Sequence, residues 1–115
     1  MFVRQHQAQE LQLGELYVLV YAAEPDGSSS MAITSVPPGA HHRRVRSSRS
    51  DKYYYMIEGG LQFIVEGETQ TIMAGDACIV PVGQTFEYDN TSNTDARVLV
   101  VQTPPYDPSA ETYLE

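Results

Sequence analysis

The stretch GDACIVPVGQTFEYDN, residues 75–90, carries the strongest fold signal in this chain. It contains two short runs of β-forming residues, 77–80 and 85–88, separated by Pro81 and Gly83, residue types that favour chain reversal. Strand starts about 8–12 residues apart are typical of all-β sandwiches and barrels. Similar runs lie at 16–21, 31–36, 52–57, 61–66, 69–73 and 96–102. Since no window predicts a long amphipathic helix, we expect an all-β fold.

The length of 115 residues, with 42% hydrophobic and 19% charged residues, predicts one domain with a packed core. We place that core at about 16–102, with an N-terminal arm over 1–13 and a C-terminal tail over 103–115. Residues 5–13 favour a short helix or an irregular arm. Asp107 followed by Pro108 resembles a helix start, which predicts one turn over 108–112.

Three features of the sequence bear on where the protein resides in the cell. No apolar run approaches the ~20 residues that span a bilayer, and the first ten residues lack the apolar stretch of a signal peptide. The single cysteine, Cys78, fits a reducing compartment. We therefore expect a cytoplasmic protein that does not bind membranes.

The charges are unevenly distributed. The net charge is −8, which argues against a general nucleic-acid binder. Five of the seven basic residues nevertheless fall within residues 41–52, a window with one acid, Asp51. This basic stripe predicts a local site for an anion, or else an edge strand whose charges discourage association.

The stretch 75–90 resembles the second motif of the cupin family, G-x5-P-x-G-x2-H-x3-N. Gly75, Pro81, Gly83 and Asn90 match it, whereas Phe86 stands where that family has a metal-binding histidine. The resemblance implies a double-stranded β-helix, the jelly-roll barrel of cupins.

The family's first motif is recognisable mainly by its end, YYYMIEGG, residues 53–60. The resemblance then puts Lys52 at the position of the glutamate ligand, and Arg46 and Ser48 near those of the two histidines. Divalent cations need imidazole, carboxylate or thiolate ligands, and two cationic side chains would repel them. We therefore expect no bound metal and no cofactor.

Strand alternation predicts which side chains line the barrel. His41 and His42 are adjacent, so only one of them can face inward. The spacing to Tyr54 favours His41, whereas unbroken parity with Arg46 favours His42. The other residues expected in the interior are Arg46, Ser48, Lys52, Tyr54, Phe86 and Tyr88.

These residue types suit proton abstraction beside a carbonyl group. A histidine can serve as the general base, and tyrosines can donate hydrogen bonds to a developing enolate. Arg46 or Lys52 could hold an anionic group of the substrate. Dehydration, isomerisation and epimerisation share this first step.

A narrower resemblance points the same way. The chain is similar to metal-independent cupins of sugar and nucleoside metabolism, among them nucleotide-sugar ketoisomerases and uridine-5′-aldehyde dehydratases. That resemblance implies catalytic roles for His41, Tyr54, Tyr88 and Glu111, whereas the dehydratases' pocket lysine near the N-terminus has no counterpart here.

Three functions remain open at this point. The first is a metal-independent lyase or isomerase acting on a small polar, carbonyl-bearing substrate such as a nucleoside or sugar derivative. The second is a non-catalytic cupin that binds a small anion through Arg46 and Lys52. The third is a structural barrel without a ligand. For each we expect a homodimer that pairs through edge strands.

Overall fold

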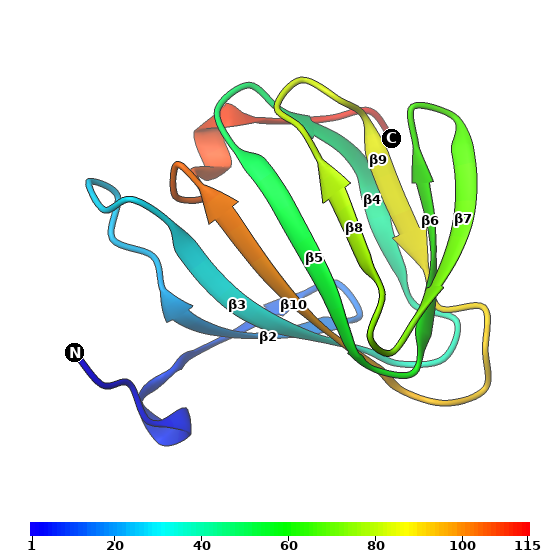
Figure 1. Ribbon diagram of the computed structural model, residues 1–115, viewed down its shortest axis with the longest axis horizontal. Helices are drawn as coiled ribbons and strands as arrows, with labels where there is room; N and C mark the ends of the chain where they lie inside the picture. Colours follow the sequence, from blue (N-terminus) through cyan, green and yellow to red (C-terminus); the bar gives the residue numbers. More distant parts are fainter.

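The computed structural model describes all 115 residues as two antiparallel sheets facing each other (Figure 1). One sheet has the strand order β1-β2-β3-β10-β5-β8 and the other β11-β4-β9-β6-β7. The first comprises β1 (Gln9–Leu13), β2 (Leu16–Ala22), β3 (Ser30–Val36), β10 (Ala96–Thr103), β5 (Asp51–Glu58) and β8 (Ala77–Val80). The second comprises β11 (Glu111–Tyr113), β4 (His41–Ser47), β9 (Phe86–Asp89), β6 (Gly60–Val65) and β7 (Glu68–Met73). The all-β jelly-roll expectation is confirmed.

Alternation along the strands builds the core between the sheets. In β10 every second residue is buried, and β5 and β9 show the same period. Tyr54, Met56, Phe63, Phe86 and Tyr88 are the largest core side chains, each at most 4% exposed. These residues point inward from both sheets and fill the space between them at one end, whereas the other end holds a cavity.

Asn90 ties the end of the decisive stretch to the rest of the barrel. Its side-chain nitrogen donates to the carbonyl oxygens of Val36 and Thr94, at 2.9 and 2.8 Å. The residue is 1% exposed. An asparagine here closes the turn between β9 and β10, because its amide satisfies two buried carbonyl groups.

The N-terminal region differs from the expected helix or irregular arm. A 3₁₀ turn spans Gln5–Gln7, and β1 then pairs with β2 over five residues. The apolar side chains of Leu11 and Leu13 alternate with polar ones, which is a strand period rather than a helical one. The arm is thus largely the edge strand of the six-stranded sheet.

The C-terminal region forms the expected single turn and then a strand. Asp107 caps the 3₁₀ turn η2 (Pro108–Ala110) by accepting a hydrogen bond from the Ser109 amide at 2.9 Å. The chain continues as β11, which pairs with β4 and crosses the open end of the sandwich (Figure 1). This crossing carries Glu111 to the barrel opening. Neither of the two short helical turns is long or apolar enough to cross a bilayer.

Candidate functional site

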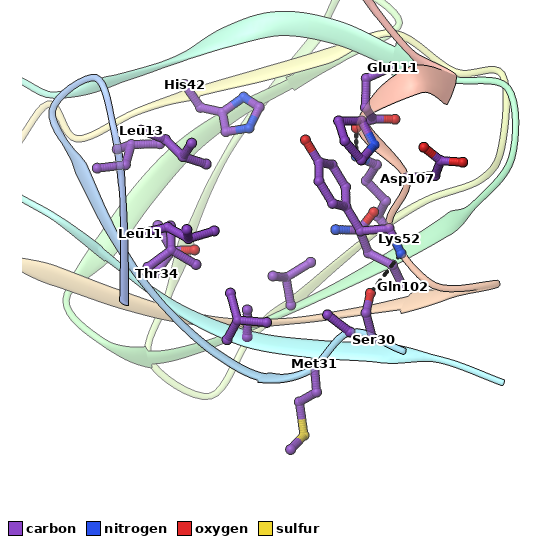
Figure 2. Close-up of a pocket in the computed structure, with 18 of the residues that line it drawn as sticks. Leu11, Leu13, Ser30, Met31, Thr34, His42, Lys52, Gln102, Asp107 and Glu111 are labelled. Atoms are coloured by element: carbon purple, nitrogen blue, oxygen red, sulfur yellow. Dashed lines mark hydrogen bonds and ion pairs between the residues drawn. The ribbon is translucent and has the colours of Figure 1, made fainter. Parts of the chain in front are cut away.

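A cavity of about 500 Å³ opens between the two sheets at the end that the core leaves free. One wall is apolar and comes mainly from the β1–β2 hairpin. The other is polar and comes from β4, β5, β9, the end of β10 and the C-terminal segment (Figure 2). The apolar wall includes Leu11, Leu13, Leu16, Val18 and Val20. The polar side chains include His42, Lys52, Tyr54, Tyr88, Gln102 and Glu111.

His42 is the histidine in this cavity. Its Nδ1 donates to the carbonyl oxygen of Arg43 at 2.8 Å, which leaves Nε2 of the neutral imidazole without a proton. The ring packs on Phe86 and Tyr88, with centroids 5.3 and 4.7 Å apart. Burial lowers the pKa of His42 to about 4, and the nearby charge of Lys52 adds to this effect. The imidazole is therefore neutral at pH 7.

His41 lies on the opposite face of β4, outside the cavity lining. Its Nδ1 pairs with Asp89 at 2.8 Å and its Nε2 with Glu115 at 2.9 Å. Partial burial lowers the pKa of His41, but the hydrogen bonds to Glu115 and Asp89 outweigh that effect, so the pKa lies above its ordinary value. The spacing argument that favours His41 for the interior is wrong. Unbroken parity with Arg46 favours His42, which does line the cavity, but Arg46 itself faces outward, so that argument reaches the right residue from a wrong premise.

Tyr54 and Tyr88 meet inside the barrel, with ring centroids 5.9 Å apart in an edge-to-face arrangement. Both line the cavity and both are nearly inaccessible to solvent, at 4% and 1% exposure. Burial raises the pKa of each phenol well above its ordinary value. Both hydroxyl groups therefore stay protonated and able to donate hydrogen bonds. Phe86 lies behind them, beneath His42, in the core rather than in the cavity wall.

Lys52 and Glu111 form a buried ion pair at the barrel opening, where Lys52 Nζ donates to Glu111 Oε1. Their side chains are 4% and 3% exposed. Burial lowers the pKa of Lys52, although the Glu111 carboxylate opposes this shift. Glu111 thus neutralises the one buried lysine and joins the C-terminal segment to β5.

Arg46 and Ser48 do not line the cavity, contrary to expectation. The ladder between β4 and β9 shifts register between His42 and Val45, so the alternation changes phase along β4. Val45 and Ser47 are buried, whereas Arg46 and Ser48 point outward and are exposed. Because of this bulge, alignment with the family's histidine positions and unbroken alternation along β4 give the wrong face for both residues.

The cavity residues do not fit the divalent metal that many cupins bind. Of the four positions compared with the family's ligands, Arg46 and Ser48 face solvent, Phe86 has no ligating atom, and Lys52 is a cation. No group of three or more histidine, cysteine, aspartate or glutamate side chains converges anywhere in the chain. His42 is the cavity's only imidazole, and the Glu111 carboxylate is already paired with Lys52.

Two features of the cavity were not recognised in the sequence. The first is the apolar wall, whose signal was the alternation of Leu11 and Leu13 in the QELQL segment of β1. The second is Gln102, the last inward position of β10 after Val98 and Val100. Its place in an otherwise apolar series of inward residues was a signal that it faces something polar.

Comparison with known proteins agrees with this architecture. The cupin domain model matches residues 32–102. The tetracenomycin polyketide synthase protein TcmJ of Streptomyces glaucescens is 42% identical over 62 residues, covering 54% of this chain and 41% of TcmJ. The oxalate-binding protein of Thermotoga maritima is 32% identical over 66 residues, covering 57% of this chain and 54% of that protein. The chain therefore matches about half the length of these curated relatives.

Solved structures superpose over almost the whole chain. Pac13, described as a unique nucleoside dehydratase, has a TM-score of 0.86 at 18% identity, with 100% of this chain and 91% of Pac13 covered. Variants of the Streptomyces Pac13 have been solved with uridine. KdgF from Halomonas sp. has a TM-score of 0.83 at 19% identity, covering 95% of this chain and 97% of KdgF. With the family model matching residues 32–102, the chain belongs to the cupin family.

Proposed function

We propose that this cupin is a metal-independent lyase or isomerase that abstracts a proton next to a carbonyl group of a small polar substrate, such as a nucleoside or sugar derivative. The observation that carries the proposal is the position of His42. It is a neutral imidazole whose Nε2 is free to accept a proton, and it packs against a buried tyrosine in the cavity.

His42 would be the general base. A pKa of about 4 makes it a weak base in the empty cavity but keeps it ready to accept a proton at pH 7. When the proton moves, an imidazolium and an enolate form side by side. Their attraction at low dielectric raises the basicity of His42 in the transition state, so the proton transfer becomes more favourable than the resting pKa suggests.

Tyr54 and Tyr88 would stabilise the enolate oxygen. Each phenol remains protonated because burial raises its pKa. Hydrogen-bond donors fixed in a site shielded from water stabilise developing negative charge without having to reorient during the reaction. The edge-to-face packing of the two rings holds them in place.

If the reaction is a dehydration, it eliminates one molecule of water from the substrate. In uridine-5′-aldehyde, the acidic proton is on C4′, next to the aldehyde carbon. His42 takes this proton, and the electron pair moves onto the aldehyde oxygen as an enolate. When the carbonyl group re-forms, the C3′–C4′ double bond forms and the 3′-hydroxyl leaves as water with the proton returned by His42. The nucleoside dehydratase Pac13 and the shared fold support this substrate class. A polyketide also carries carbonyl groups, so the likeness to TcmJ is compatible with the same proton abstraction.

A second candidate is non-catalytic binding of a small anion such as oxalate. Lys52 lies in the cavity, and the 32% identity to an oxalate-binding protein supports this alternative. An anion would have to compete with Glu111 for the Lys52 ammonium group.

A thermal-shift screen separates the two functions. The purified protein is heated with uridine, nucleotide sugars, keto acids and oxalate, because a ligand at a hundred times its Kd stabilises by ~2.7 kcal/mol. Stabilisation by uridine and dehydration of uridine-5′-aldehyde support the lyase. Stabilisation by oxalate without turnover of any carbonyl compound overturns the lyase in favour of the binding protein.

A further inference from the structure

Gln102 occupies a distinctive position in the cavity. It is the last inward residue of β10, and the strand register places it beside Lys52 of β5 and Ser30 of β3. These three residues form a polar row at the end of the cavity away from the apolar hairpin (Figure 2). Gln102 is 9% exposed, so its side chain is more than nine-tenths buried.

The other two members of the row are already engaged. The Ser30 hydroxyl accepts a hydrogen bond from the Tyr106 amide at 2.9 Å, and the Lys52 ammonium pairs with Glu111. Only the Oε1 atom of Gln102, among the buried side-chain nitrogen and oxygen atoms, has no hydrogen-bond partner. A buried acceptor without a partner destabilises the folded state, so its retention calls for a binding role.

We propose that the Gln102 carboxamide recognises a cyclic amide or imide edge of the substrate, as found in a pyrimidine base. A carboxamide presents one acceptor and one donor side by side, and rotation about its last bond exchanges them. In the empty cavity Oε1 is covered by protein. This rotation turns it toward the cavity, where it accepts the N–H of an imide edge. This inference rests on the proposed function and names the substrate class more closely.

The charges at this end of the cavity favour an uncharged ring over an anion. Glu111 neutralises Lys52, and the nearby Arg49 guanidinium donates to the carbonyl oxygens of Pro105 and Pro25, at 2.9 and 3.2 Å. Both cations line the cavity, but protein acceptors already engage their charged groups, so neither is a free anion clamp.

The separation between Gln102 and the reacting groups suits a molecule with two parts. Tyr54 is paired with Val100, two residues before Gln102 on the same strand face. At a strand rise of ~3.3 Å per residue, the two positions are about 7 Å apart along β10. A ring held at Gln102 would thus place an attached carbonyl arm near Tyr54 and His42.

A chemical double-mutant cycle tests the inference. Binding of uridine and of N3-methyluridine, which lacks the imide donor, is measured by calorimetry for the wild type and for Gln102→Met. We expect methylation and substitution each to weaken uridine binding about tenfold or more, and the two losses together not to add, because both remove the same contact. The matched control Gln70→Leu, on the exposed strand β7, should leave both affinities unchanged.

Stability measurements distinguish a binding role of Gln102 from a purely structural one. Gln102→Met removes the unpaired acceptor and fills the same space, so its melting temperature should equal or exceed that of the wild type. A lower melting temperature together with unchanged uridine affinity would show that Gln102 is structural.

The outcomes also separate this inference from the proposed function. Equal affinity for uridine and N3-methyluridine in the wild type, with turnover of uridine-5′-aldehyde intact, overturns the role of Gln102 alone. If neither uridine nor uracil binds the wild type at millimolar concentration, imide recognition is wrong. The proton abstraction by His42 is then judged separately, on keto acids and nucleotide sugars.

Discussion

The imidazole of His42 packs in a tilted arrangement on the phenol of Tyr88 with 4.7 Å between ring centroids, while the adjacent His41 binds Asp89 at 2.8 Å on the other face of β4. Two neighbouring histidines thus occupy opposite environments. One is desolvated and neutral inside the cavity. The other lies between two carboxylates at the surface. A substitution of His41 can therefore serve as the matched control for the same substitution of His42.

Replacing His42 should remove the chemical step. His42→Gln is expected to lower kcat on uridine-5′-aldehyde by ~10²–10⁴-fold, the usual contribution of a general base. His41→Gln should change kcat less than about threefold, because that ring does not reach the cavity. Steady-state kinetics on both variants, with circular dichroism to show that both fold, check this prediction. A loss confined to His41→Gln would contradict it.

The pKa values of the two histidines should be shifted in opposite directions from that of a free histidine. Burial lowers the pKa of His42 to about 4, whereas hydrogen bonds to Glu115 and Asp89 raise that of His41 above 6.5 despite its partial burial. Nuclear magnetic resonance titration of the imidazole protons should resolve the two values. Assignment uses the single variants His41→Gln and His42→Gln. A His42 pKa at or above 6.5 would show that the imidazole is not desolvated.

Stability should consequently depend on His42 in acid. Between pH 6.5 and about 4, the unfolded chain protonates this histidine and the folded protein does not. The unfolded state therefore binds more protons, and the free energy of unfolding falls as the pH drops through this window. Urea denaturation at pH 7 and pH 4.5 should show a smaller loss for His42→Gln than for the wild type. The same loss in both proteins would contradict the pKa assignment.

The buried tyrosines should matter for rate more than for binding. Tyr54→Phe and Tyr88→Phe each remove one donor to the enolate, and such losses typically lower kcat by ~10²–10³-fold. Tyr53→Phe is the matched control, since Tyr53 lies on the outer face of β5 at 42% exposure. Full kcat in both buried variants would remove the tyrosines from the mechanism.

The Lys52–Glu111 pair should behave as a buried ion pair. Lys52→Met alone leaves the Glu111 carboxylate buried without its partner, which typically destabilises by ~3–5 kcal/mol. The double variant Lys52→Met/Glu111→Leu should recover most of this loss, whereas Arg46→Met at the surface should have little effect. Urea denaturation measures all three. A double variant no more stable than Lys52→Met alone would indicate that the pair does not interact as the structure shows.

Metal dependence gives a further test. The cavity's donor set leads us to expect activity that survives dialysis against a chelator, and no stoichiometric Fe, Ni, Mn or Zn by elemental analysis. One equivalent of any of these metals, removed together with activity, would contradict the metal-independent mechanism.

The fold was predictable because its signals are local. Gly75, Pro81, Gly83 and Asn90 mark turns and their closure, and the alternation in β5, β9 and β10 gives the correct faces for Tyr54, Phe86 and Tyr88. Each of these depends on residues close together in the chain. Strand period and turn chemistry therefore suffice for them.

The errors in the site came from non-local features. The bulge between His42 and Val45 reverses the faces of Arg46 and Ser48. The sequence HHRRVRS, residues 41–47, contains no pattern that predicts this bulge. The apolar wall depends on β1 pairing with β2, and the pairing of Lys52 with Glu111 depends on β11 crossing to β4. Such contacts between distant residues become visible only when the chain is folded.

Nuclear magnetic resonance in D₂O at pD 7 can follow the C4′ proton of uridine-5′-aldehyde and so test proton abstraction by His42 itself. We expect the wild type to remove this proton and release the 3′-hydroxyl as water, and folded His42→Gln to slow proton loss at least ~10²-fold. His41→Gln should match the wild type. Proton loss at the wild-type rate in His42→Gln, or no proton loss in the wild type, would contradict the account.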